Sequence, residues 1–111
     1  MARSKSLRGT LDLLILKALS GDDALSGFAI KQKIKRESSG VLHARDSSLY
    51  PALKRMKRAG WIQFYGVTTG RRRARVWELT NAGKKQFSEE KALWTTFSST
   101  VNELLKRQWK T

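Results

Sequence analysis

The side chains best suited to recognise another molecule lie in the middle of the chain, beginning with residues 46–58. This segment carries two serines and a tyrosine ahead of four basic residues: Ser47, Ser48, Tyr50, Lys54, Arg55, Lys57 and Arg58. Hydroxyl groups at a helix start can bind phosphates, and the first turn of a recognition helix is the part that reaches base edges. We therefore expect the serines and Tyr50 to read duplex DNA, with Lys54 and Arg55 as phosphate or base contacts. The plain alternative is a solvated basic face.

A second basic group follows a glycine turn and consists of Arg71, Arg72, Arg73 and Arg75. The flanking stretches, residues 61–67 and 74–79, are rich in aromatic and β-branched residues, which predicts a β-hairpin. Repulsion among four arginines at one tip favours a nearby anion, and arginine is favoured in the narrow minor groove of DNA. We expect the tip to contact DNA, although a flexible charged tip without a ligand would look similar.

The charge of the chain supports a polyanionic partner. The 111 residues include 23 basic and 9 acidic side chains, a net charge of +14. Residues 31–75 hold 13 of the basic residues against Glu37 and Asp46. The excess therefore lies inside one predicted domain rather than in a terminal tail, and phosphate neutralisation is its most direct use.

Composition excludes several classes of site and protein. There is no cysteine, and His43 is the single histidine, which we interpret as a loop or strand residue. No apolar run approaches the roughly 18 residues of a membrane span. No nucleophile–base arrangement, paired carboxylates or Gly-rich phosphate loop occurs. We expect a cytoplasmic protein that is not an enzyme and has no cofactor, metal or membrane partner.

Apolar spacing predicts three helices before the hairpin. Leu7–Leu19 forms the first, with Thr10 as a cap, and Ser26 caps the second. Val41 and Leu42 could form a short extended segment. The third helix begins near Ser47, and its serine pair is expected to accept hydrogen bonds from the first-turn amides. Its buried stripe is predicted to be Leu49, Ala52, Leu53 and Met56.

A long final helix, capped by Thr80, is predicted from about residue 81 to 108. Such a helix would be about 42 Å long, which is more than the preceding body can cover. Its apolar residues form a seam with heptad spacing: Phe87, Trp94, Phe97, Val101, Leu104 and Leu105. A second copy of the same helix is the simplest partner for this seam, so we expect a homodimer.

The order of three helices, a hairpin and a long helix predicts a mainly α fold: a winged helix-turn-helix in residues 1–80 with a C-terminal dimerisation helix in residues 81–111. Several segments resemble PadR-like bacterial transcriptional regulators. They are Gly9–Leu16, Ser47–Leu53, Gly60–Ile62, Arg72–Arg75 and Leu79–Gly83. The run Leu-Tyr-Pro-Ala-Leu, paired with Leu-Thr-Asn-Ala-Gly downstream, is fairly specific. One departure is Ser26-Gly27-Phe28, where the family usually has His-Gly-Tyr.

The resemblance implies a nucleoid-associated transcriptional regulator, a repressor that binds a pseudo-palindromic operator as a dimer. It also implies that some members hold flat aromatic effectors between the paired last helices, where Trp94 and Phe97 would be the stacking residues. Dimer core is the competing interpretation of these two rings. Two other functions remain open: a sequence-nonspecific architectural or RNA-binding winged helix, and a protein-interaction adaptor whose charge serves solubility.

Overall fold

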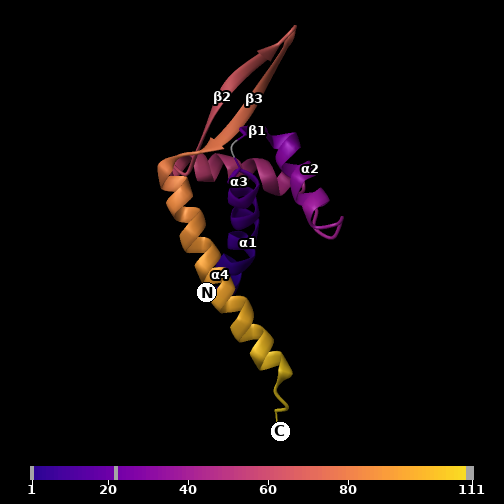
Figure 1. Ribbon diagram of the computed structural model, residues 1–111, viewed down its shortest axis with the longest axis vertical. Coiled ribbons are helices and arrows are strands. Elements are labelled where there is room, and N and C mark those ends of the chain that lie inside the picture. Colours follow the sequence, from indigo (N-terminus) through magenta and orange to yellow (C-terminus); the bar gives the residue numbers. More distant parts are fainter. Residues whose placement is uncertain (1, 22, 110–111) are drawn as a thin grey trace.

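The computed structural model describes residues 2–21 and 23–109, with the backbone alone for residues 2–9 and Thr69. The elements, in chain order, are α1 (Ala2–Ala18), β1 (Leu25–Ser26), α2 (Gly27–Glu37), α3 (Asp46–Arg58), β2 (Ile62–Thr69), β3 (Arg72–Leu79) and α4 (Asn81–Lys106). The predicted mainly α winged helix is confirmed. The hairpin β2–β3 projects from one end of the molecule, and α4 runs past α1 towards the other end (Figure 1).

The sheet has three antiparallel strands in the order β1-β3-β2. The hairpin was predicted, and its strands are longer than expected because pairing continues to Thr69 and Arg72 at the tip. The two-residue strand β1, which pairs Leu25 with Trp77, was not predicted. A strand this short has no alternation of polar and apolar residues that could reveal it.

The core lies where α1, α2, α3 and the base of the sheet meet. Its largest fully buried side chains are Ile15, Leu16, Ile30, Leu49, Leu53, Met56 and Ile62. The predicted stripe of α3 is buried in full, because four apolar side chains at helical spacing occupy a single face. The opposite face of α3 is left to solvent.

Two of the four predicted helix caps are confirmed. The Ser26 hydroxyl accepts a hydrogen bond from the Ala29 amide at 3.1 Å, and the Thr80 hydroxyl accepts one from the Gly83 amide at 3.0 Å. The prediction for Thr10 is wrong, since α1 begins eight residues earlier, at Ala2. The apolar pattern near residue 10 marks where the helix meets the body rather than where it begins.

The prediction that Ser47 and Ser48 cap α3 is also wrong. The helix begins one residue before Ser47, and its N-cap position is Arg45, which makes no side-chain capping bond. The backbone carbonyl of Arg45 accepts from the amides of Ser48 and Leu49 instead. Both serine hydroxyls are therefore free of a capping role. Val41 and Leu42 do not form a strand but lie exposed in the loop before α3.

The first turns of α4 pack on the body of the molecule. At Gly83 an added Cβ would fall on the carbonyl oxygen of Trp61, so the approach of α4 to this segment requires glycine. Phe87, which we expected in the dimer seam, is partly buried and packs against the core of its own chain. At this level α4 still lies beside the body, and the place of Phe87 in a dimer seam stays a prediction.

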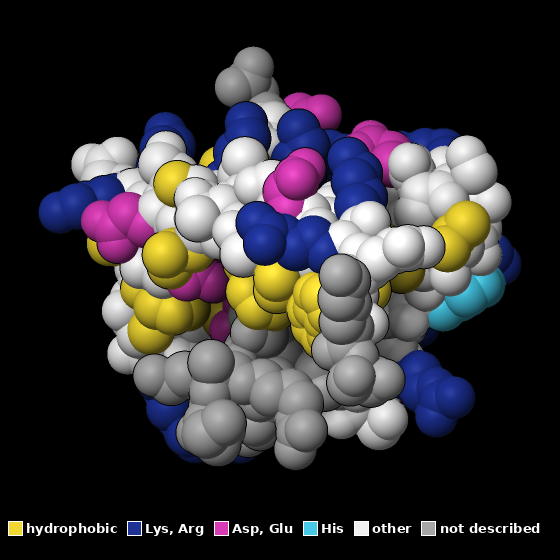
Figure 2. All heavy atoms as spheres, turned by 90° about the horizontal axis from the view of Figure 1, so that it is seen from below, with side chains coloured by type: hydrophobic (Ala, Val, Ile, Leu, Met, Phe, Trp, Pro, Cys, Tyr) yellow, Lys and Arg dark blue, Asp and Glu magenta, His cyan; other side chains and the backbone are white. Residues whose placement is uncertain are grey.

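The far half of α4 extends beyond the body at one end and the hairpin at the other, so that the molecule measures 65 Å along its long axis against 29 Å and 24 Å in the other directions. A view from this end shows hydrophobic side chains at the surface among Lys and Arg side chains (Figure 2). In the part of the chain that the structure describes, no helix is long and apolar enough to span a membrane.

Candidate nucleic-acid interface

The solvent-facing side of α3 is a single row of residues. An α-helix turns by about 100° per residue, so positions separated by four, seven and eleven residues lie in one line. Ser47, Pro51, Lys54 and Arg58 have this spacing, and all four are exposed. They lie opposite the buried stripe and form the centre of the surface that α3 can offer to a ligand. Arg58 was not among the predicted contacts, although the helical period identifies it.

One flank of this row, Ser48 and Arg55, turns towards α1. Arg55 Nη2 donates to Asp12 Oδ1 at 2.5 Å, and the Asp12 side chain is mostly buried. The predicted contact residue Arg55 is thus held by an intramolecular ion pair. A cation in this position orients α3 on α1 and is less available to DNA than Lys54.

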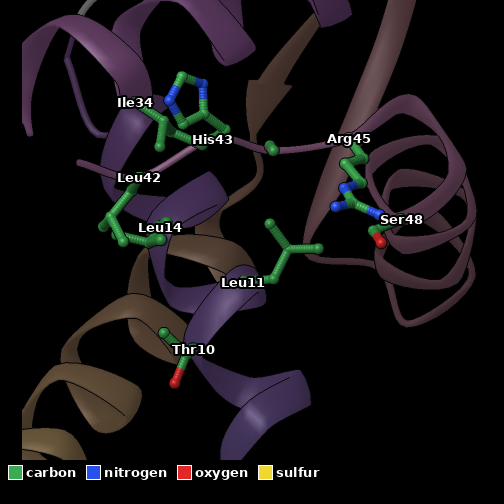
Figure 3. Close-up of a pocket in the computed structure, with 9 residues that line it drawn as sticks. Thr10, Leu11, Leu14, Ile34, Leu42, His43, Arg45 and Ser48 are labelled. Carbon is green, nitrogen blue, oxygen red and sulfur yellow. The ribbon is translucent and has the colours of Figure 1, made fainter. Parts of the chain in front are cut away.

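Ser48 lines an open hollow of about 510 Å³ beside the start of α3 (Figure 3). Its apolar lining comes from α1, α2 and the loop before α3: Leu11, Leu14, Ile34, Leu42 and Ala44. Thr10, His43 and Arg45 complete the lining, and His43 is an exposed loop residue as predicted. Of the serine pair, only Ser47 therefore lies at the centre of the outward row.

The other flank of α3 packs against α2. The ring of Tyr50 lies over Gly27, where an added Cβ would stand 2.8 Å from Tyr50 Cε1. Lys31 of α2 donates to Asp46 of α3 at 2.5 Å, and this hydrogen bond raises the pKa of Lys31 above its ordinary value. Glycine at position 27 thus lets the two helices approach closely, and Tyr50 stays half-exposed at their junction.

The pairing of the hairpin divides its arginines between two faces. Paired residues share a face, and the face alternates along each strand. Arg73 pairs with Thr68 and Arg75 with Gly66, on the face of the buried Trp77. Arg72 pairs with Thr69 on the opposite face, which also carries Tyr65 and Val67. Arg71 lies in the turn between the strands. All four predicted wing arginines are exposed, but they do not form one cluster.

An aromatic group joins the base of the wing to the end of α3. Phe64 packs against Trp77 with ring centroids 5.0 Å apart. Lys57 Nζ lies 4.9 Å from the centroid of Phe64, and the guanidinium carbon of Arg75 lies 4.2 Å from it. Cations at these distances are attracted by the ring quadrupole. Neither Lys57 nor Phe64 was predicted as part of the site, because their contact depends on how the hairpin folds back on α3.

The far half of α4 presents the other unpaired surface. Trp94 is 42% exposed, Phe97 46% and Leu105 78%, and Leu104 is also exposed while Val101 is half-buried. The rings of Trp94 and Phe97 lie 5.9 Å apart at an angle of 36°. Together with Phe87 these residues make up the predicted seam, and a single chain leaves Leu105 largely exposed and Trp94, Phe97 and Leu104 a little under half exposed.

The described residues contain no group of three or more His, Cys, Asp or Glu side chains that could hold a metal ion. Exposed cationic side chains lie instead on the outward row of α3 and along the wing.

Comparison with known proteins identifies the family. The model of the transcriptional regulator PadR-like family matches residues 15–89, more than half of the chain. A search of curated proteins finds no match. Among solved structures, a transcriptional regulator from Clostridium thermocellum matches with a TM-score of 0.83 and 22% identity, covering 92% of this chain and 99% of that one. At this identity the likeness shows the fold alone.

Two other solved structures are closer in sequence. A PadR family transcription regulator from Clostridium difficile is 30% identical, with a TM-score of 0.71, and the match covers 85% of this chain and 96% of that one. Bacillus subtilis PadR in complex with operator DNA is 25% identical, with a TM-score of 0.62, over 91% of this chain and 49% of that one. The chain therefore belongs to the PadR-like family of transcriptional regulators, whose members are regulators and not enzymes.

Proposed function

We propose that the protein is a homodimeric transcriptional repressor that binds a pseudo-palindromic operator in double-stranded DNA. The observation that carries this proposal is the outward row of α3, in which Ser47, Lys54 and Arg58 are exposed beside an arginine-bearing wing. The operator-bound crystal structure of the Bacillus subtilis relative supports the choice of ligand. A ligand of this kind places the protein in the cytoplasm, in association with the nucleoid.

Within this interface we assign different tasks to different residues. Ser47 and Tyr50 lie in the first turns of α3, the part of a recognition helix that contacts base edges, and Ser48 lies at its margin. Lys54 and Arg58 lie further along the helix and suit the phosphate backbone, which fixes register without reading sequence. Arg55 can contact the phosphate backbone only when its ion pair with Asp12 is broken. The wing arginines contact the backbone or the minor groove.

The dimer is formed by residues 81–111, and residues 1–80 form the winged helix that it positions. Trp94, Phe97, Val101, Leu104 and Leu105 supply the contact surface. A row of exposed apolar side chains on one helix face is typical of an interaction site. A two-fold axis through the paired α4 helices places the two recognition helices about 34 Å apart, one turn of duplex DNA.

Trp94 and Phe97 carry a second proposal, a site for a flat aromatic effector that relieves repression. Their two rings are adjacent and exposed, and aromatic rings stack in offset or tilted arrangements at such distances. Dimer packing alone would also account for them. Planar aromatic compounds are titrated against the tryptophan fluorescence of the wild-type chain and of Trp94→Phe; a change that is lost in Trp94→Phe indicates a ligand platform, and no change in either indicates a purely structural contact.

The competing function is sequence-nonspecific binding of nucleic acid. The two functions predict different results when random DNA competes for the protein. We would measure binding to a labelled duplex recovered by selection, at moderate salt and with an excess of unlabelled random duplex. A specific regulator keeps its labelled duplex, because specific binding is typically 10³-fold or more tighter than nonspecific binding. A nonspecific binder releases it in proportion to the competitor. An adaptor with no nucleic-acid ligand binds neither DNA, even at low salt.

A further inference from the structure

We infer that Lys57 and Arg75, gathered on the ring of Phe64, form a phosphate-binding site at the junction of α3 and the wing. This inference rests on the proposed function and adds a specific anchor point to it. Lys57 comes from the last turn of α3 and Arg75 from the middle of β3. The two residues are 18 positions apart in the chain, and the turn of the hairpin brings both to the same ring.

The electrostatic situation of this pair favours an anion. Two cationic groups gathered at one ring repel each other, and a phosphate bound beside them would relieve this repulsion. In the part of the chain that the structure describes, the ion pairs are Lys31–Asp46, Arg55–Asp12 and Lys106–Glu103. Neither Lys57 nor Arg75 has a carboxylate partner among these residues, and both side chains are exposed. The pair is therefore open to an external anion.

The position of the pair selects the backbone phosphate of a nucleic acid. Lys57 lies ten residues after Ser47, which is about 15 Å along the helix axis. When the first turn of α3 reaches base edges, this end of the helix lies further along the same duplex, beside the wing. The ammonium and guanidinium groups lie 4.9 Å and 4.2 Å from one ring centroid, and hence within about 9 Å of each other, so both suit the oxygens of one stretch of phosphate backbone, whereas base edges require a planar set of donors and acceptors.

Phe64 acts as a positioning residue in this site. Its ring is held by Trp77, which is buried in the core, so the cation-binding face is fixed relative to the sheet. Lysine and arginine side chains lose considerable rotamer freedom when they bind a phosphate. A rigid ring that already gathers them reduces this loss. Leucine at position 64 would keep the apolar packing but remove the attraction for the two cations.

The test is the salt dependence of binding to a random-sequence duplex of about 20 base pairs, because phosphate contacts do not depend on sequence. The variants are Lys57→Ala and Arg75→Ala, with Lys91→Ala on α4 as the charge-matched control. Each of the first two should lower the slope of log K against log salt by about 0.9, and the control should leave it unchanged. Phe64→Leu should weaken binding, and Phe64→Tyr should restore it.

A double-variant comparison separates positioning from a general structural role. In a Lys57→Ala, Arg75→Ala background, Phe64→Leu should cause no further loss of binding, since there are no cations left to gather. An equal loss in both backgrounds would overturn the role of Phe64. Slopes for Lys57→Ala and Arg75→Ala equal to the wild-type slope would overturn the site and leave the proposed function standing. If the wild-type chain bound no duplex at low salt, the proposed function would fail, and the site with it.

Discussion

Arg55 of α3 donates a hydrogen bond to the mostly buried carboxylate of Asp12 on α1, so that α3 is tied to the helix that runs beside α4. The Asp12 side chain is 12% exposed and that of Arg55 40% exposed. Arg55, which the sequence alone predicts to contact DNA, thus makes an ion pair within the folded chain. The pair adds a polar contact between α1 and α3 to the apolar packing of the buried stripe.

Replacing Asp12 with Ala should destabilise the fold. The change leaves the partly buried guanidinium of Arg55 without this carboxylate, and because Arg55 retains access to water we expect a loss of about 1–2 kcal/mol rather than the larger cost of a fully buried pair. Urea denaturation of the folded chain measures it. Glu103→Ala, which breaks an exposed pair with an N–O distance of 3.6 Å, is the control and should change stability by less than about 0.5 kcal/mol. Equal losses in both variants would contradict the structural role of Asp12.

Gly27→Ala should affect DNA binding more than stability. The added methyl group would contact the ring of Tyr50, which is half-exposed and can move away. We expect stability within about 1 kcal/mol of wild type but about tenfold weaker binding to a selected duplex, because Tyr50 is displaced from its flank of α3.

Gly21→Ala is the matched control for this change, since a Cβ at position 21 meets only the end of the Lys33 side chain, at 3.7 Å, and position 21 lies outside α3 and the wing. In a Tyr50→Ala background, Gly27→Ala should have no further effect on binding. A tenfold loss that persisted without Tyr50 would mean that the methyl group acts through the backbone of α2.

The arginines of the wing should contribute unequally. Arg73 lies on the face of the hairpin that continues to Phe64 and Trp77, and Arg72 lies on the opposite face. Arg73→Ala should therefore lower the slope of log K against log salt by about 0.9, and Arg72→Ala by clearly less. The two variants control each other, because they remove the same side chain from neighbouring positions. Equal slopes would show that strand alternation does not decide which arginine reaches DNA.

Changing Phe97 and Leu104 together to Lys should give monomers in light scattering and should remove most of the affinity for a two-fold operator. Charged side chains on an apolar contact face oppose its burial. Ala92 and Ser99 lie on the opposite side of α4 at about 100° per residue and are both exposed, so Ala92→Lys with Ser99→Lys adds the same charge away from the seam. That control should remain dimeric. A Phe97, Leu104 variant that stayed dimeric would mean that another surface holds the two copies together.

The sequence was sufficient to predict the elements that carry a periodic pattern. The stripe of α3, the hairpin around Gly70 and the caps at Ser26 and Thr80 all follow from local spacing or local hydrogen bonding. The family motifs could be recognised for the same reason, since they lie in these elements. The structure places Ser47 and Lys54 on the outward row of α3, and their contacts with DNA remain predictions.

The features that sequence did not reveal depend on contacts between distant segments. Arg55 could be assigned to Asp12 only once α1 and α3 were packed, because the two residues are 43 positions apart. The contact of Phe87 with its own core has a similar cause: the heptad spacing is continuous, but the body covers the first turns of α4. The length of the helix predicted that the body would not cover all of it, but the sequence did not indicate at which residue the covered part ends.

The most direct test of the account is selection of bound duplexes from a random DNA pool with the wild-type chain. The proposed two-fold dimer predicts enrichment of an inverted repeat whose half-sites are centred about one helical turn, roughly 10 base pairs, apart. Ser47→Ala should alter the preferred bases within each half-site, whereas Lys54→Ala should weaken binding uniformly. Recovery of sequences with no shared motif, or of a single half-site without a repeat, would contradict the proposal of a dimeric operator-binding repressor.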